Sequence, residues 1–182
     1  MATQRLGIVM HGITGRMGYN QHLVRSICAI RAAGGVLLAN GDRVMPDPIL
    51  VGRNREKVAE IAKACGIARV GDSVEAALGN SDDTVFFDAG STAMRFDLLS
   101  AAIKAGKHVY AEKPVAETLE QALSLARKAR DAGFPVLIDH DLSKRCAHIG
   151  DWEYLTSHSD IAQSAKQHIY HQMDKSGEEK TL

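Results

Sequence analysis

The feature that most constrains the fold of this chain is a regular alternation of short apolar runs with amphipathic stretches between residues 6 and 138. Such alternation is typical of βαβ units, in which a helix joins each strand to a parallel neighbour. The run T-V-F-F-D at residues 84–88 is apolar on both faces, as a central parallel strand requires. We therefore predict an α/β fold built on a doubly wound parallel sheet of about six strands.

Turn signals between the runs define the expected elements. The expected strands cover residues 6–10, 49–51, 68–70, 84–88, 108–111 and 136–138. The expected helices cover residues 16–33, 55–65, 74–78, 93–105 and 119–132. Residues 34–48 separate the first helix from the second strand by more than the usual few residues, which predicts an inserted loop.

One run, A-G-K-H-V-Y-A-E-K-P-V-A at residues 105–116, combines a helix stop, a buried strand and a polar turn. Glu112, Lys113 and Pro114 follow the strand at its carboxyl end, where open α/β sheets bind their ligands. A lysine held there can neutralise or protonate an oxyanion, and the proline after it restricts the backbone that aims it. Lys113 is therefore the candidate catalytic residue.

The turn between the first strand and the first helix has the sequence G-I-T-G-R-M-G at residues 12–18. Glycines let a backbone approach a pyrophosphate closely, and a helix N-terminus supplies amide donors and partial positive charge. The spacing G-x-x-G-x-x-G differs from the usual G-x-G-x-x-G, so the turn alone is a moderate signal. His11, just before it, has either a structural role or a ligand contact. The candidate cofactor-binding residues here are Gly12, Thr14, Gly15, Arg16 and Met17.

Together, the two motifs resemble the Gfo/Idh/MocA family of nicotinamide-dependent oxidoreductases, in which A-G-K-H-V-x-x-E-K-P is a signature. The resemblance covers roughly residues 5–133. It implies a Rossmann domain and hydride transfer between nicotinamide and a secondary alcohol or ketone of a sugar, cyclitol or related polyol. It also implies that Lys113 holds the substrate oxygen beside C4 of the nicotinamide, that Glu112 lies near the nicotinamide ribose, and that the Lys113–Pro114 peptide is cis.

The end of the second strand bears on the choice of cofactor. Folds that prefer NAD usually carry Asp or Glu there to bind the ribose 2′-hydroxyl, whereas this chain has G-R-N-R at residues 52–55. Arg53 can pair with a 2′-phosphate and Asn54 can hydrogen-bond it, which favours NADP over the alternative, NAD. Another interpretation is that these arginines are solvated cations at the start of a helix.

Residues 34–48 are interpreted as a loop on the adenosine side of the cofactor, or as a surface excursion without a role.

The turn after the fourth strand, A-G-S-T at residues 89–92, is a cofactor site by the same resemblance, which places it under the nicotinamide ribose and pyrophosphate. Gly90, Ser91 and Thr92 are small or hydroxylic, as close approach requires. Capping of the following helix by Ser91 or Thr92 is the alternative. The resemblance adds Glu112, Lys113 and Pro114 to the cofactor-binding set.

The resemblance further implies a proton relay, usually completed by Asp and His from a second domain that is a large open β-sheet layer. Too few residues remain here to build that domain. The nearby candidates, which stay outside the main prediction, are Asp139, His140, Asp141 and His148. His168 and His171 could share a helix face with a metal ion, but without a third ligand a solvated face is favoured, and no metal site is predicted.

Composition bounds the remaining possibilities. The 22 cationic side chains balance 22 anionic ones, so no bulk charge recruits nucleic acid or an anionic membrane. No apolar run has the length of a bilayer span. The odd number of cysteines, widely spaced in sequence, favours a reducing compartment, and we expect a cytoplasmic protein. Cys28 and Cys65 are expected to be small core residues.

Residues 1–142 are predicted to form the dinucleotide-binding domain, and residues 143–182 a tail that is disordered or partly helical, with a helix over 159–174. Two functions stay open. The chain is an NADP-dependent oxidoreductase, either a minimal form or one completed by a partner chain, or it is a truncated or non-catalytic dinucleotide-binding module. Without a substrate domain, exposed apolar surface predicts a homo-oligomer or association with a chain that supplies that domain.

Overall fold

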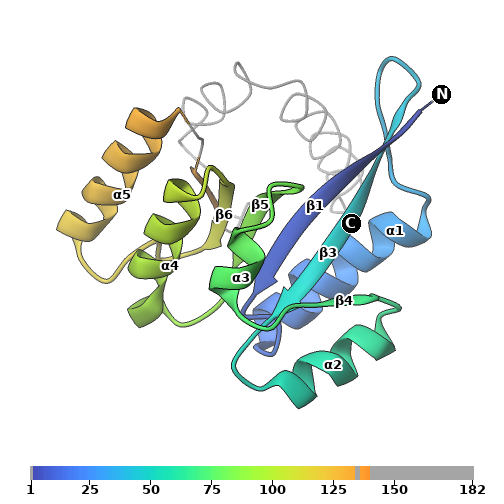
Figure 1. Ribbon diagram of the computed structural model, residues 1–182, viewed down its shortest axis with the longest axis horizontal. Coiled ribbons are helices and arrows are strands. Elements are labelled where there is room, and N and C mark those ends of the chain that lie inside the picture. The colour runs from blue at the N-terminus through green and yellow to red at the C-terminus, as the bar shows by residue number, and fades with distance from the viewer. Residues whose placement is uncertain (1, 134–135, 140–182) are drawn as a thin grey trace, which may run out of the picture.

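The computed structural model describes residues 2–133 and 136–139, which form a twisted sheet with helices packed against it (Figure 1). The strands are β1 (Thr3–His11), β2 (Val36–Leu37), β3 (Arg43–Val51), β4 (Arg69–Val70), β5 (Asp83–Asp88), β6 (His108–Glu112) and β7 (Val136–Asp139). The helices are the π-helix η1 (Met17–Cys28), α1 (Ala29–Ala32), α2 (Arg55–Ala64), α3 (Val74–Leu78), α4 (Thr92–Lys104) and α5 (Leu119–Ala132). Within the described residues every expected strand and helix is present, and the first helix is divided into η1 and α1.

The sheet has the strand order β2-β3-β1-β5-β6-β7, and β4 also pairs with β3. Every pairing is parallel except that of β2 with β3. His11, at the carboxyl end of β1, pairs with Val51 on one side and Asp88 on the other. Strand order therefore reverses at β1, and open α/β sheets bind ligands at the carboxyl ends of the strands beside such a reversal. The predicted doubly wound parallel sheet is confirmed.

Alternating side chains along the strands build two cores, one on each face of the sheet. Val9, Phe86 and Leu99 belong to the core under α3, α4 and α5. Met10 and Phe87 belong to the core under η1 and α2. In Figure 1, α4 and α5 lie on the left and α1 and α2 on the right. Because successive strand side chains point to opposite faces, both faces of the central strands are buried, as a doubly wound sheet requires.

The prediction of an inserted loop over residues 34–48 is wrong. This stretch contains β2 and the start of β3, which begins at Arg43. Arg43 pairs with Thr3, so the β2–β3 hairpin lies at the amino end of β1, opposite the glycine turn and away from the expected adenosine side. Pro46 and Pro48 favoured the loop interpretation because proline cannot donate to a ladder. They are accommodated between the part of β3 that pairs with β2 and the part that pairs with β4.

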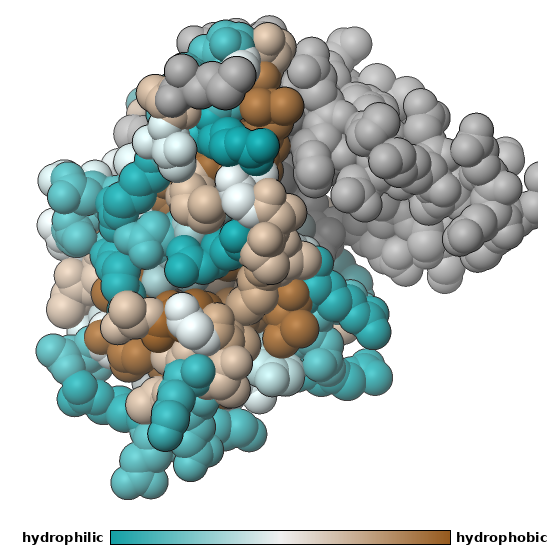
Figure 2. Space-filling view, turned by 90° about the vertical axis from the view of Figure 1, so that its right-hand side faces the viewer, coloured by the Kyte–Doolittle hydropathy of each residue, from teal (hydrophilic) through white to brown (hydrophobic). Residues whose placement is uncertain are grey.

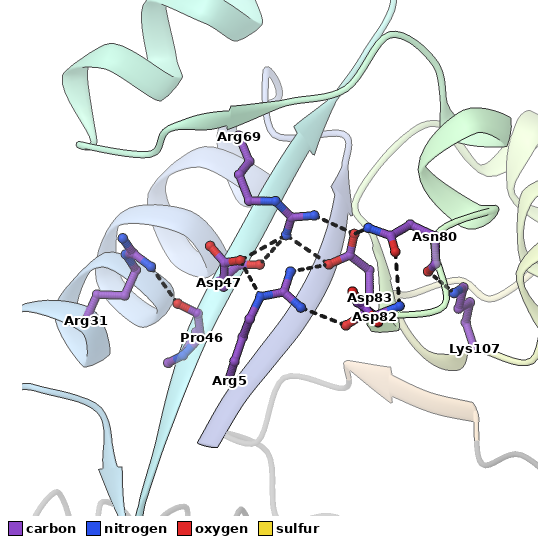
Figure 3. Close-up of polar contacts among 9 residues, drawn as sticks. All are labelled: Arg5, Arg31, Pro46, Asp47, Arg69, Asn80, Asp82, Asp83 and Lys107. Atoms are coloured by element: carbon purple, nitrogen blue, oxygen red, sulfur yellow. Dashed lines mark hydrogen bonds and ion pairs between the residues drawn. The ribbon is translucent and has the colours of Figure 1, made fainter. Parts of the chain in front are cut away.

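An ion-pair cluster ties together the strands β1, β3, β4 and β5 in the amino half of the sheet (Figure 3). The fully buried Asp83 accepts hydrogen bonds from Arg69 at 2.6 and 2.8 Å and from Arg5 at 2.8 Å. Asp47 accepts from Arg5 at 2.6 Å and from Arg69 at 3.1 Å. Burial raises the pKa of Asp83, but the two guanidiniums lower it more, so the pKa lies below its ordinary value. The cluster fixes the strand ends on the side of the sheet opposite the candidate site.

Cys28 and Cys65 are free thiols that pack against the core beneath η1 and α2, as expected. Burial, with the neighbouring Cys65 as the next cause, raises the pKa of the Cys28 thiol to about 11. The Cys28 side chain is therefore a protonated, apolar packing element at neutral pH.

Figure 2 shows the side of the molecule that lies at the right of Figure 1, where apolar patches are interrupted by polar surface. The described residues include several exposed large apolar side chains, among them Leu37 on β2, Val70 on β4, and Leu119 and Leu123 on α5. In residues 2–133 and 136–139, no helix combines the length and apolar character that crossing a bilayer requires. Self-association through apolar surface stays a prediction.

Candidate functional site

The candidate residues gather at the carboxyl edge of the sheet, in the turns after β1, β3, β5 and β6. The turns after β1 and β5 touch backbone to backbone, because the amide of Ala89 donates to the carbonyl of His11 at 3.1 Å. Gly12 has φ +78°, and a Cβ there would lie 2.3 Å from the nitrogen of Gly90. Glycine is therefore required at position 12 both by its backbone conformation and by the approach of the neighbouring turn.

The predicted glycine-turn residues lie where a ligand can reach them. Thr14, Gly15, Arg16 and Met17 are all exposed. The amide of Gly15 donates to the carbonyl of Gly12 at 3.1 Å, which closes a tight turn before η1 begins. Arg16, the residue that precedes η1, makes no side-chain capping bond in the described part of the chain. The amide of Tyr19 donates to the carbonyl of Gly15 at 2.9 Å, so the amides before it are the ones that the start of η1 can offer to an anion.

Residues 53–56, at the carboxyl end of β3, line an open surface hollow. The Oδ1 atom of Asn54 accepts a backbone N–H of the first turn of α2 at 3.0 Å, so this side chain caps the helix. Arg55 pairs with Asp72 on the surface. The guanidinium of Arg53 is exposed and has no hydrogen bond or ion pair within residues 2–133 and 136–139. Of the two predicted phosphate-binding residues, Arg53 is the one whose donors are all available.

Glu112 points into the protein, toward η1. Its Oε1 atom lies 2.8 Å from Nε2 of His22, and the two residues are only 6% and 7% exposed. The imidazole of His22 also packs against the rings of Phe87 and Tyr110, with centroids 4.6 and 5.7 Å away. Glu112 thus joins the end of β6 to η1. His22 was not predicted as a site residue; its signal in the sequence is a polar residue beside the apolar positions of the first helix, next to Leu23.

Lys113 and Pro114 are exposed immediately after β6, and the peptide between them is cis, as the resemblance implies. Val109 and Ala111 of β6 are buried, so the strand that carries the lysine is anchored in the sheet. The hydroxyl of Thr118 accepts the amide of the third residue of α5 at 3.2 Å and thereby starts the next helix. The lysine therefore lies on a short segment held at both ends.

A buried arginine that was not predicted from the sequence lies beneath these turns. Arg95 of α4 is only 2% exposed. Its Nε donates to Oδ2 of Asp88 at 2.7 Å, its Nη2 donates to the carbonyl of Gly90 at 2.6 Å, and its Nη1 donates to the carbonyl of Pro114. Its helical spacing could have predicted its burial, because Arg95 lies four residues before Leu99 on the buried face of α4.

Asp88 connects this arginine to β1. Its Oδ1 lies 2.7 Å from Nδ1 of His11 and 3.0 Å from the amide of Gly90, which donates to it. Burial raises the pKa of Asp88, but the hydrogen bonds from His11 and Arg95 lower it more, so the carboxyl is ionised at neutral pH. His11 therefore has a structural role in a network that links the ends of β1 and β5.

Ser91 and Thr92 lie in the turn and at the start of α4. Ser91 has the backbone conformation of a residue that precedes a helix, but it makes no side-chain capping bond in the described part of the chain. The alternative that Ser91 serves as a side-chain cap is therefore wrong. Its hydroxyl is exposed at the carboxyl edge of the sheet.

The remaining candidates are placed only in part. Asp139 ends β7 and is the register partner of Glu112. The residues and segments that lie outside the described ranges are His140, Asp141, His148, His168, His171, the helix expected over 159–174 and the tail 143–182.

Comparison with known proteins places the chain among oxidoreductases. A family model described as an oxidoreductase family with an NAD-binding Rossmann fold, GFO_IDH_MocA, matches residues 47–140. A D-xylose dehydrogenase of Paenarthrobacter nicotinovorans is 46% identical over 134 residues, which are 74% of this chain and 34% of that protein. A 1,5-anhydro-D-fructose reductase of Ensifer adhaerens is 34% identical over 122 residues, 67% of this chain and 34% of that protein.

Solved structures agree with this assignment. An NAD-binding oxidoreductase from Klebsiella pneumoniae superposes with a TM-score of 0.60 at 25% identity, over 74% of this chain and 34% of that one. The chain spans about a third of the length of the curated relatives it matches. The family model, the identities and the shared fold show that this chain belongs to the Gfo/Idh/MocA family of oxidoreductases and forms its NAD-binding Rossmann fold.

Proposed function

We propose that this chain serves an NADP-dependent oxidoreductase that transfers a hydride between nicotinamide and a secondary alcohol or ketone of a sugar or related polyol. The relatives support the substrate class, because a D-xylose dehydrogenase and a 1,5-anhydro-D-fructose reductase are 46% and 34% identical to it.

The observation that carries the choice of NADP is the end of β3. A carboxylate at this position would accept from a ribose 2′-hydroxyl and repel a 2′-phosphate, but the chain has Gly52 followed by Arg53. Arg53 is exposed on an open surface at this strand end, and all of its guanidinium donors are available within the described residues. A guanidinium binds phosphate through paired, charge-assisted hydrogen bonds, which a hydroxyl cannot match.

The strand order supports one direction for the bound cofactor in this proposal. With its 2′-phosphate at Arg53 after β3, a dinucleotide crosses the glycine turn after β1 and reaches the turns after β5 and β6. Its pyrophosphate would then lie over the start of η1, and its nicotinamide would lie beside Lys113. The cofactor, when bound, supplies the hydride acceptor. The Lys113 ammonium would hold the substrate oxygen. In ketone reduction, the reverse reaction, it would stabilise the negative charge that grows on this oxygen as hydride adds to the carbon, and it would donate the proton that completes the alcohol.

We also propose a cytoplasmic location and a small-molecule sugar substrate. The free thiols of Cys28 and Cys65 suit a reducing compartment. A homo-oligomer, or a partner chain that completes the substrate site, remains part of this proposal.

The test uses the 182-residue chain with NADP⁺ and D-xylose, followed through the fluorescence of the reduced cofactor. We expect turnover that falls about 100-fold or more in Lys113→Met, with a much smaller change in NADPH affinity. Binding of NADPH without reduction of NADP⁺ by any polyol would support the alternative, a dinucleotide-binding module without turnover. No binding of NADPH by the folded chain would contradict both.

A further inference from the structure

The turns after β5 and β6 are held by one buried side chain. Arg95 donates to the carbonyl of Gly90 in the first turn and to the carbonyl of Pro114 in the second. These two acceptors flank the candidate residues Ser91 and Lys113. Since backbone carbonyls fixed by a common donor cannot move apart independently, Arg95 controls the separation of the two turns.

We propose that Arg95 is a positioning residue that holds the turns after β5 and β6 at the separation required by the nicotinamide half of the cofactor. The proposal rests on the proposed function for the identity of the ligand. It does not make Arg95 a catalytic residue, because its guanidinium is buried below the turns and does not reach the open edge of the sheet.

Arginine suits this task for a geometric reason. Its planar guanidinium offers five N–H donors in a fixed fork, so one side chain can serve three acceptors on two segments. Here they are the carboxylate of Asp88 and the carbonyls of Gly90 and Pro114. A lysine carries its charge on one nitrogen and cannot span the same three positions. Asp88, 2.7 Å away, compensates the charge that burial of Arg95 brings into the protein.

The network extends to the glycine turn through His11, whose Nδ1 lies 2.7 Å from Oδ1 of Asp88. The three side chains His11, Asp88 and Arg95 therefore link the carboxyl ends of β1 and β5 to the turn after β6.

The cluster of Arg5 and Asp83 lies toward the amino ends of the strands, away from these turns, where side-chain carboxylates join the strands.

The first test compares Arg95→Lys with the control Asp83→Asn, which weakens the fold far from the site. Each protein is titrated with NADPH and with 2′,5′-ADP, a fragment that carries the adenosine phosphates and lacks nicotinamide. We expect Arg95→Lys to lose about ten-fold in NADPH affinity while its affinity for 2′,5′-ADP stays within about two-fold of the original chain. Asp83→Asn should leave the affinities for NADPH and for 2′,5′-ADP both unchanged. Equal losses for both ligands in Arg95→Lys, or no loss, would overturn the proposal.

A second test needs no cofactor and so separates this proposal from the proposed function. Amide hydrogen exchange is measured in the original chain, in Arg95→Lys and in the milder Asp88→Asn, which retains the shape of the network if Arg95→Lys fails to fold. We expect exchange about ten-fold faster in peptides that cover residues 89–92 and 113–117, with residues 43–51 unchanged. Uniform acceleration across the chain, or unchanged exchange in the two turns, would contradict a positioning role even if NADPH fails to bind.

Discussion

The imidazole of His22 and the carboxylate of Glu112 form a buried contact of 2.8 Å between residues 90 positions apart in the chain. The contact joins the middle of η1 to the last residue of β6, immediately before Lys113. It therefore couples the helix that follows the glycine turn to the strand that carries the candidate catalytic residue. A polar pair in this position is stabilising only while both members are present, because an unpaired buried carboxylate is costly.

Replacing His22 by Leu should lower the free energy of unfolding by about 2 kcal/mol, because Glu112 is left without this partner in a buried site. The same change should cost clearly less in a chain that already carries Glu112→Met, where no carboxylate remains. Urea unfolding of the four proteins of this double-mutant cycle measures the coupling. Equal costs in both backgrounds would mean that the pair contributes nothing.

The glycine at position 12 should tolerate no side chain. A residue other than glycine pays about 1–2 kcal/mol for positive φ, and crowding against the turn after β5 adds about 1–3 kcal/mol. Gly12→Ala should therefore destabilise the protein by about 2–5 kcal/mol. Gly66→Ala is the matched control, since Gly66 also has positive φ, +63°, but an added Cβ meets no atom within 4 Å. Comparable midpoints of thermal unfolding for the two variants would contradict the packing described for the turn.

The buried cluster at the amino half of the sheet gives a second matched pair. Asp83→Asn should cost about 3 kcal/mol, because it removes the anion that two guanidiniums share in a buried position. Asp82→Asn, the same change one residue earlier, should stay within about 0.5 kcal/mol, because Asp82 is exposed and contributes its backbone carbonyl to Arg5. Urea unfolding at neutral pH measures both. A cost for Asp82→Asn as large as that for Asp83→Asn would contradict the assignment.

Stability should fall in acid with a definite sign. The pKa values of Asp83 and Asp88 lie below their ordinary value of 3.8 in the folded protein, so the unfolded chain binds protons more readily there. The stabilisation is complete above that ordinary value and is lost as the pH falls through the lower folded pKa values. Unfolding midpoints at about pH 5, 4 and 3 should therefore decrease in that order, less steeply in Asp83→Asn. A stability that rises on acidification would refute these pKa directions.

Much of the fold follows from local signals. Gly106 and Gly133 adopt positive φ within two residues of the ends of α4 and α5, as helix-stop glycines do. Apolar runs such as residues 84–88 are strands because both of their faces are buried. The hairpin of β2 and β3 escaped prediction because Pro46 and Pro48 signal a loop locally, and only the pairing of the rest of β3 with β1 shows that the strand continues.

The site residues that lie on the turns could be predicted from the sequence. Those buried beneath the turns could not. Lys113 and Gly12 stand in runs of characteristic sequence at strand ends. Arg95 and His22 look locally like ordinary helix residues, and their importance comes from acceptors far away in sequence, such as Pro114 and Glu112. Helical periodicity predicts that a charged residue lies on an exposed face unless its buried partner is known. Buried polar contacts between distant segments therefore become visible only in the folded structure.

The central claim is that this chain binds NADP in preference to NAD through Arg53, and calorimetric titration of the chain with NADPH and NADH tests it most directly. We predict NADPH binding at least about ten-fold tighter than NADH binding, a preference that Arg53→Ala abolishes and that Lys63→Ala, which removes a cation at the other end of α2, preserves. Equal affinities for the two cofactors, or a preference that survives Arg53→Ala, would contradict the account.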